Sequence, residues 1–339
     1  MRIGIVAPPW GPIPPDLYGG IEQAVDGLAC GLQAAGHEIL LYTTGDSTCP
    51  VPRKWLLEQA EGDRMGFTVP ELRHVMAAYD TIAESDIDIV HDHTVLGPVY
   101  AEGYTELPVV TTVHGPFNEE LIDLYGRVAH RVPLIGISQA QVKVAPQVAI
   151  AKVIHHGVDA GSFPVGQGGD YCLFLGRMGA DKGPHRAIAV AREAGLPIKL
   201  AGKLREPWEH RFFNAEIAPL LGEDVEYMGE VSQAEKVELL GGARATLFPI
   251  RWNEPFGLVM IESMACGTPV LAFREGAAPE VVADGSTGFL CVDESDMAEK
   301  LQGIDTIVRA ECRAAVEGYF SRQRMIDEHV AFYEEILRR

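Results

Sequence analysis

The chain has 339 residues, 47% of them hydrophobic, and a formal net charge of −20 at pH 7. Its length predicts two domains, and its apolar content excludes a disordered chain. The acidic balance argues against binding of nucleic acid and against stable association with anionic membranes, because both attract net basic surfaces.

The compartment is predicted from the apolar runs and the cysteines. No run reaches the roughly 18 residues of a membrane span, and the start MRIGIVAPPW predicts a first strand, not a signal peptide. We therefore expect a cytoplasmic protein. The cysteines are scattered without a C-x-x-C pattern, so we expect buried, reduced thiols at Cys30, Cys49, Cys172, Cys266, Cys291 and Cys312.

The first half of the chain alternates short β-branched runs with helical periodicity, which predicts βα units around a parallel sheet. Ile21, Val25, Leu28 and Leu32 share one helical face between the first two strands. The expected strands cover residues 3–7, 38–44, 87–91, 108–114, 133–138 and 151–156.

A glycine-rich segment, GVDAGSFPVGQGGD at 157–170, is the best candidate for a linker. After it the alternation resumes, with expected strands at 171–176, 197–202, 225–229, 245–250, 269–273 and 287–291, and final helices at 305–318 and 322–338. The α/β pattern predicts two Rossmann-like, doubly wound domains, 1–160 and 170–320, that face a central cleft. Ligands of such sheets bind at the carboxyl ends of the strands.

Two loops at expected strand ends suit an anion. In YGGIE, Gly19 and Gly20 stand where the first loop meets the first long helix, whose free N–H groups can bind an anion. In LGRMGADKG, Arg177 and Lys182 follow a strand across a glycine-containing turn. Cations there are costly unless they meet an anion, and a planar guanidinium beside an ammonium suits a diphosphate. A plain turn and solvated surface charges stay open as alternatives.

EPFGLVMIE places the carboxylates Glu254 and Glu262 on either side of a Pro-Phe-Gly turn. A helix is expected to begin near 256–258, with Glu254 level with its free N–H groups and Glu262 further along. A carboxylate can accept hydrogen bonds from two neighbouring sugar hydroxyls. One acid would hold a hexose and the other a ribose, which predicts a nucleotide-sugar site. The alternative is a capping Glu254 and a solvated Glu262.

Histidines and aspartates near strand ends were the other candidates for chemistry. His91 is expected in the core, and His114, followed by Gly115, is expected to face the cleft. His91 and His93 form an H-x-H pair that could bind a metal, but no third ligand with suitable spacing is evident, so no metal site is predicted. Asp86 and Asp88 form a D-x-D pattern but precede their strand, at the wrong end of the sheet, and are expected to be solvated.

With these elements in order, the chain resembles glycosyltransferase family 4, which consists of retaining enzymes with a GT-B fold. The E-x7-E pattern in EPFGLVMIESMACGTPV is the most specific part, and GRMGADKG, YGGIE, HHGVD and GAAPEVVADGSTGF accompany it in the expected order over nearly the whole chain. Two positions depart from the family pattern. His156 stands where an asparagine is usual, and Lys203 stands where a small acidic residue is common.

The resemblance implies roles for the residues that match. Arg177 and Lys182 would contact the donor diphosphate, aided by the backbone of Gly20 next to Gly19. His114 would border the transferred sugar near the reacting carbon. The last helix, about 322–339, would pack back on the first domain.

The same resemblance places the rest of the donor along the second domain. Glu254 would hold the transferred sugar, and Glu262 would bind the nucleotide ribose. Catalysis would thus rest on His114, Arg177, Lys182 and Glu254. The backbone amides that help to hold the sugar would be those of Phe256, Gly257 and Leu258, and the base would lie by Met228 and Gly229.

The expected function is that of a retaining glycosyltransferase that moves a hexose from a nucleoside-diphosphate sugar, with UDP-glucose favoured, to a hydroxyl of a carbohydrate or other soluble acceptor. Cations and helix amides would stabilise the leaving diphosphate without a metal or cofactor. Because no carboxylate is free to act as a nucleophile, a same-face substitution is expected. A non-catalytic nucleotide-sugar-binding protein and a GT-B sugar-nucleotide epimerase are the alternatives.

Overall fold

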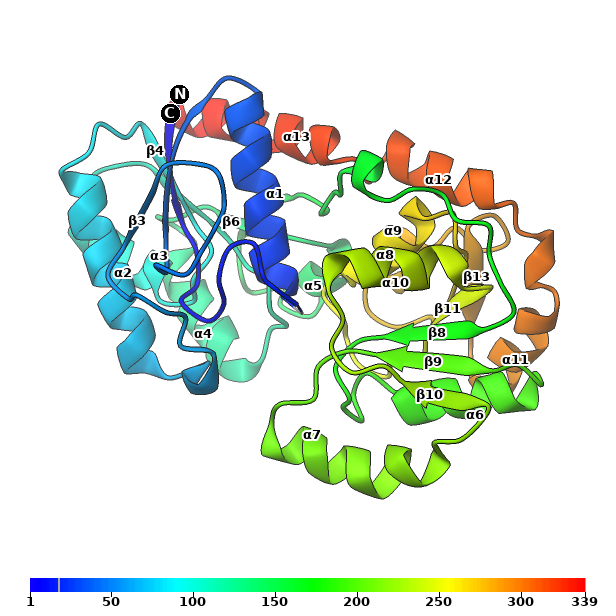
Figure 1. The fold of residues 1–339 in the computed structure, drawn as a ribbon. Helices are drawn as coiled ribbons and strands as arrows, with labels where there is room; N and C mark the ends of the chain where they lie inside the picture. The colour runs from blue at the N-terminus through cyan, green and yellow to red at the C-terminus, as the bar shows by residue number, and fades with distance from the viewer. Residues whose placement is uncertain (18, 339) are drawn as a thin grey trace. The chain divides into compact units, whose positions relative to one another are not determined.

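The computed structural model describes residues 1–17 and 19–338, and the chain divides into two compact units (Figure 1). The first unit comprises Met1–His156 and Arg322–Arg339, and the second comprises Gly157–Ser321. The segment predicted as a linker therefore begins where the second unit begins.

The later part of that segment is held within the second unit. The Gly166 N–H donates to the Cys266 carbonyl at 3.0 Å, and the Gly166 carbonyl accepts from Arg309 Nε at 3.0 Å. The glycines of this segment thus let its backbone pack closely against the rest of the second unit. The composition of the segment predicts a change of chain direction but not this packing.

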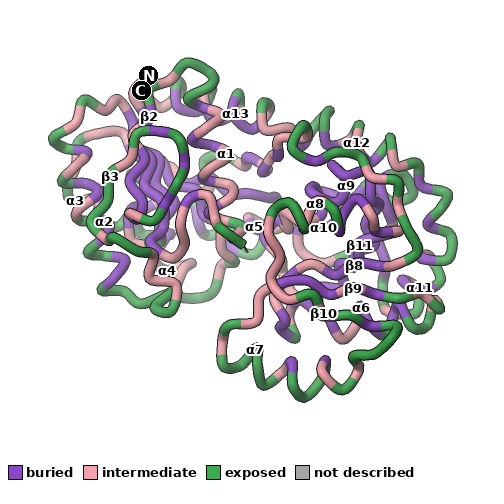
Figure 2. Tube along the Cα trace, viewed as in Figure 1, coloured by how far each residue is buried: buried purple, intermediate pink, exposed green. Residues whose placement is uncertain are grey.

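The first unit contains a seven-stranded, all-parallel sheet in the order β3-β2-β1-β4-β5-β6-β7, and the predicted parallel α/β architecture is confirmed. The central strands are buried (Figure 2), as expected for a parallel sheet covered by helices. The strand β3 was not predicted, because RKW is a short, mostly exposed edge strand without an apolar run. The strands are β1 (Arg2–Val6), β2 (Glu38–Thr43), β3 (Arg53–Trp55), β4 (Ile89–Asp92), β5 (Val109–Thr112), β6 (Leu134–Gly136) and β7 (Ile150–Val153).

Helices cover both faces of this sheet. On one face α1 and α13 share a core with Ile3 and Ile5, and on the other α2 and α3 pack with Val6 and Val90. The alternation of neighbours along β1 follows from the two-residue period of a strand. The helices are α1 (Gly20–Ala34), α2 (Thr68–Ala83), α3 (Gly97–Tyr104), α4 (Glu119–Val128), α5 (Gln139–Lys143) and α13 (Arg322–Leu337), with a 3₁₀ turn at Gly62–Arg64.

Asp86 and Asp88 lie before β4, at the amino end of that strand, as predicted. Asp86 is exposed, but both carboxylates contact Arg2, and Asp88 accepts the Arg2 N–H and Nη2 at 2.7 Å each. The expectation that both are merely solvated is therefore wrong for Asp88, which anchors the start of β1.

The second unit contains a six-stranded parallel sheet in the order β10-β9-β8-β11-β12-β13. Its strands are β8 (Cys172–Leu175), β9 (Ile198–Ala201), β10 (Val225–Tyr227), β11 (Ala245–Phe248), β12 (Val270–Phe273) and β13 (Gly288–Cys291). Each lies within a predicted strand, because buried parallel strands are continuous apolar runs.

The helices of the second unit are α6 (Pro184–Glu193), α7 (Pro207–Phe212), α8 (Gln233–Gly242), α9 (Leu258–Ala265), α10 (Ala278–Val281), α11 (Glu294–Gln302) and α12 (Arg309–Gly318). Short 3₁₀ turns occur at Ala160–Ser162, Ala218–Leu220 and Ile304–Thr306, and a π-helical turn at Phe213–Ile217. The helix predicted from residue 305 thus begins later, at Arg309.

Five cysteines are buried, and Cys30 is half-buried; all six are free thiols. Burial raises the pKa of the Cys172 and Cys312 thiols to about 12, which keeps both protonated. Among the helices described, none is both long and apolar enough to cross a bilayer.

Several histidines of the first unit are buried as neutral rings. Burial lowers the pKa of His74 and of His329 to about 4 in each case. His329 lies on α13, where its Nδ1 is 2.7 Å from the Met325 carbonyl oxygen. Because the unfolded chain binds a proton on each ring below about pH 6.5, the stabilisation from these rings is lost as the pH falls from there towards about 4.

We predict that replacing His329 makes the first unit less sensitive to acid. From about pH 7.5 to about pH 5, the wild-type protein should lose about 2 kcal/mol more unfolding free energy than His329→Gln. Urea unfolding at both pH values measures this difference. Burial raises the pKa of Asp92 to about 7, which opposes the histidine effect but is common to both proteins. Equal losses in the two proteins would contradict the prediction.

Candidate functional site

Arg177 follows β8 and is bound by carboxylates of its own unit. Its Nη2 donates to Asp181 Oδ2 at 2.6 Å, its Nη1 lies 3.5 Å from Glu209 Oε1, and its guanidinium lies 5.2 Å from the centre of the Trp208 ring. Glu209 is fully buried. Arg177 is thus paired with two carboxylates and only 25% exposed, so it is not a free, solvated surface charge.

Lys182 and Glu254 form an ion pair between Lys182 Nζ and Glu254 Oε2. Their side chains are only 11% and 13% exposed. The Lys182 ammonium also lies 4.7 Å from the centre of the Trp252 ring, which attracts a cation electrostatically. The structure therefore joins directly two residues to which the sequence assigned separate roles, at the diphosphate and at the sugar.

The helix α9 begins directly after the Pro-Phe-Gly turn, as predicted. Gly257 is its N-cap in a left-handed conformation, with φ 85°, and no side chain caps the helix. The N-cap position is thus Gly257 and not Glu254, whose carboxylate pairs with Lys182, and the amide of Leu258 stands at the first turn of α9. The Phe256 side chain is buried, 6.3 Å from the ring of Phe320 between centres, so Phe256 can offer a ligand only its backbone.

Glu262 lies within α9 and is ion-paired with Lys236 of α8, with Lys236 Nζ at 2.6 Å from Glu262 Oε1. The side chains are 5% and 14% exposed, respectively. The alternative interpretation, that Glu262 is a solvated helix residue, is therefore wrong. The two carboxylates of the E-x7-E pattern each have a different lysine as partner.

Met228 and Gly229 lie just beyond the carboxyl end of β10, where ligands of parallel sheets bind. The Met228 N–H donates to the Leu200 carbonyl at 2.8 Å, and the Met228 side chain is exposed. The Gly229 carbonyl accepts from Gly202 N–H at 2.8 Å. This position is compatible with a flat apolar contact to a base, the role predicted for it.

In the first unit, Gly19 and Gly20 stand at the start of α1, where Gly19 is the N-cap without a side-chain cap. The Glu22 carboxylate lies next to Gly19, since a Cβ on Gly19 would be 2.8 Å from Glu22 Oε2. A negative side chain at this turn interacts well with the free N–H groups of a helix. Tyr18, the first letter of the YGGIE motif, lies outside the described residues.

His114 follows β5 and is bonded to another histidine. His114 Nε2 is 2.8 Å from His93 Nδ1, and the His114 ring stacks on His156 at 5.4 Å between centres. Burial, and then the nearby His93, hold the pKa of His114 well below its ordinary value. His156, the departure from the family pattern, is thus a packing partner of His114 within the first unit.

Sequence reasoning missed the partners of the predicted residues. Asp181 stands within the quoted motif, but its neighbours gave no sign that it binds Arg177. Lys236 and Trp252 belong to no motif. The segment around Lys236, EVSQAEKVE, is largely polar, so it gives no local signal that this lysine is withdrawn from solvent.

Comparison with known proteins gives consistent matches along the chain. The family model "Glycosyltransferase Family 4" matches residues 18–162, and the model "Glycosyl transferases group 1" matches residues 162–324. Glycogen synthase of Mycobacterium tuberculosis is 25% identical over 93% of this chain and 88% of its own length. Phosphatidyl-myo-inositol mannosyltransferase of Mycolicibacterium smegmatis is 29% identical over 90% of this chain and 84% of its own.

A solved structure shows the same fold. HepE of Anabaena, in complex with UDP and glucose, aligns with a TM-score of 0.80 at 19% identity and covers 99% of this chain and 100% of its own. At this identity the likeness concerns the arrangement of the backbone.

The position of Glu254 depends on Gly276, which leads to a prediction. Gly276 has φ 52°, and a Cβ there would lie 2.5 Å from the Glu254 nitrogen. Gly285 also has positive φ, 81°, but nothing within 4 Å. Gly285→Ala should therefore cost about 1 kcal/mol of unfolding free energy, from backbone strain alone. Gly276→Ala should cost roughly 1–3 kcal/mol more, because Glu254 must move. Urea unfolding of both variants tests this, and equal costs would contradict it.

Proposed function

Because the chain belongs to the family 4 glycosyltransferases, with the GT-B fold, we propose that it transfers a hexose from a nucleoside-diphosphate sugar to an acceptor hydroxyl with retention of configuration. The observation that carries this proposal is the pair Lys182–Glu254 at the start of α9, with Glu262 further along the same helix. The ammonium suits the diphosphate, Glu254 and the start of α9, which has no side-chain cap, suit the sugar hydroxyls, and the buried Glu262 suits the ribose.

The proposal for the donor is a UDP-glucose type. It is supported by the fold shared with HepE, whose structure contains UDP and glucose. The names of the relatives include both a glycogen synthase and a mannosyltransferase, so the sugar is the first variable to test. For the acceptor we propose a soluble hydroxyl compound, because the chain carries a formal charge of −20 and offers little attraction to anionic lipid.

The ion pair suggests how the donor is received. A diphosphate that approaches Lys182 competes with Glu254 for the ammonium, because both are anionic. Once Lys182 turns to the phosphate, the Glu254 carboxylate can accept hydrogen bonds from the sugar hydroxyls. Ligand binding would thus give Lys182 a phosphate and Glu254 hydroxyl donors in place of each other, so that neither charge is left without a hydrogen-bond partner.

The reaction then needs no carboxylate nucleophile. The bond from the anomeric carbon to the diphosphate oxygen breaks, and the acceptor oxygen bonds to the same face of that carbon. The proton of the acceptor hydroxyl passes to the leaving phosphate oxygen. Lys182, with Arg177 and the α9 amides, stabilises the negative charge that develops on the diphosphate. The roles of Gly19, Gly20 and His114 remain predictions of the sequence resemblance.

The reaction outcome tests the proposal. A thermal-shift panel of UDP-, GDP- and ADP-sugars first identifies the donor, since a ligand bound by the folded state raises the melting temperature. With that donor, proton NMR should show a product that keeps the anomeric configuration. After chelation, added Mg²⁺ or Mn²⁺ should not raise the transfer rate. An inverted product, or activity that depends on either added ion, would contradict the mechanism.

Substitution of Glu254 and of Glu262 is predicted to affect different steps, catalysis in the first case and nucleotide binding in the second. Glu262→Gln should weaken binding of the free nucleoside diphosphate by about tenfold or more, since the lost bond to a ribose hydroxyl is charge-assisted. Glu254→Gln should leave that affinity unchanged or raise it, because Lys182 no longer has a competing carboxylate. It should instead lower kcat, since the charge beside the reacting sugar is lost.

Calorimetry with the nucleoside diphosphate compares these variants. Lys236→Gln is the matched control, because it breaks the ion pair but keeps the Glu262 carboxylate, and it should retain the affinity. If Glu254→Gln weakens nucleotide binding as much as Glu262→Gln does, the proposed division of roles is wrong.

A further inference from the structure

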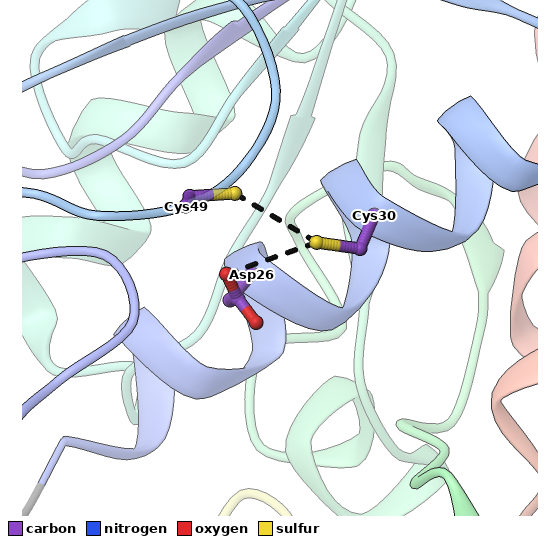
Figure 3. A group of neighbouring side chains, drawn as sticks. All are labelled: Asp26, Cys30 and Cys49. Carbon is purple, nitrogen blue, oxygen red and sulfur yellow. Dashed lines mark hydrogen bonds between the residues drawn. The ribbon is translucent and has the colours of Figure 1, made fainter.

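One carboxylate and two thiols converge in the first unit, at a place that the proposed reaction does not use (Figure 3). Asp26 and Cys30 are four residues apart on α1 and so lie on one face of that helix, and Cys49 comes from the segment after β2. Cys30 Sγ lies 3.8 Å from Cys49 Sγ and 3.9 Å from Asp26 Oδ1. The three ligand atoms lie within 4.8 Å of one another.

These separations resemble the edges of a tetrahedral zinc site. Two sulfurs bound to zinc at about 2.3 Å are about 3.8 Å apart, and a sulfur and a carboxylate oxygen are about 3.6 Å apart. The observed Cys30–Cys49 distance equals the first value, and the Cys30–Asp26 distance is slightly longer than the second. The third edge, between Asp26 and Cys49, measures at most 4.8 Å, so the Asp26 side chain must close on both sulfurs when the ion binds.

The surroundings of Cys49 fix its position. Its N–H donates to the Ile13 carbonyl at 2.7 Å, the Val51 N–H donates to its sulfur, and the residue is fully buried. Cys30 and Asp26 are partly exposed, so an ion can enter from their side. One ligand is therefore preorganised by the backbone, and two are accessible on a rigid helix.

The charges of the cluster favour a cation. A hydrogen bond from Cys49 lowers the pKa of the Cys30 thiol, whereas the nearby Asp26 opposes its ionisation and Arg322 assists it. The hydrogen bond with Cys30, then burial, and to a smaller extent the Asp26 carboxylate raise the pKa of the Cys49 thiol. A divalent ion between the carboxylate and the two sulfurs would be attracted to all three ligand atoms.

We propose that Asp26, Cys30 and Cys49 bind a zinc ion, with solvent as the fourth ligand. On binding, both thiols release their protons to solvent, and the two thiolates and the carboxylate each form a bond to the ion. The site ties α1 to the segment after β2 and stabilises the first unit. A disulfide between the two cysteines would require an external oxidant and would leave Asp26 without a role.

Metal uptake by the intact chain tests the site without any glycosyl transfer assay. Reduced protein, stripped of metal and then exposed to Zn²⁺ and desalted, should retain about one zinc ion per chain and melt at a higher temperature than the stripped protein. Substitution with Co²⁺ should give the intense near-ultraviolet absorption of a thiolate–cobalt bond.

Variants show whether these residues are responsible. Cys30→Ser and Asp26→Asn, both at partly exposed positions, should weaken zinc binding by at least about tenfold. Cys312→Ser, a buried thiol in the second unit, should bind zinc like the wild type. Equal uptake by all the variants, no uptake by the wild type, or a Cys30–Cys49 disulfide found by mass spectrometry in place of zinc would overturn the proposal.

Discussion

The ion pair between Lys182 and Glu254 is the interaction on which the arrangement of the second unit's candidate site depends. Both side chains are largely withdrawn from solvent, so each charge is stable there only while the other is present. Removing one partner of such a pair typically costs about 3–5 kcal/mol, because the other is left uncompensated. A ligand that supplies a replacement charge avoids this cost. In the proposed donor complex the diphosphate would be the new partner of Lys182, and the sugar hydroxyls would donate to Glu254.

Backbone contacts hold the main chain of Glu254 in place beside Lys182. The Glu254 carbonyl accepts the Ala277 N–H at 3.0 Å, and the loop that contains Gly276 packs directly on the Glu254 backbone. On the other side, Gly257 starts α9 without a side-chain cap. The first turn of the helix, which has no side-chain cap, thus lies next to a carboxylate that is paired with a lysine. Because Glu254 pairs with Lys182, its carboxylate does not occupy the N-terminus of α9, where ligand oxygens could bind.

The sequence predicted the sheets well because buried parallel strands are continuous apolar runs, and it missed β3 because that edge strand has none. It also predicted the start of α9 from Pro255 and Gly257. It did not predict the charge partners. Lys182 and Glu254 are 72 positions apart, and Lys236 and Glu262 are 26 apart. The premise that cations at a strand end must meet an anion was correct, but the anions present are carboxylates of the chain itself, which no local pattern identifies.

In the first unit, the environment of His114 likewise depends on residues that are distant in the sequence. His114 is bonded to His93, and the His93 ring lies 4.1 Å from that of His91, whose Nδ1 is 2.6 Å from the Tyr333 hydroxyl oxygen of α13. Burial holds the pKa of all three histidines low, so each ring is neutral and has one N–H donor and one acceptor.

Only one proton can lie between His114 Nε2 and His93 Nδ1, and its position decides whether His114 Nδ1 donates or accepts. His93 and His114 also line a cavity of about 10 Å³, room for about one water molecule. His93 Nε2 is buried there without a hydrogen-bond partner among the described residues. The tautomer of His114, and with it the character of Nδ1, therefore depends on His93, whose ring packs on His91. Because His91 contacts Tyr333 of the last helix, residues near the end of the chain take part in the packing around His114.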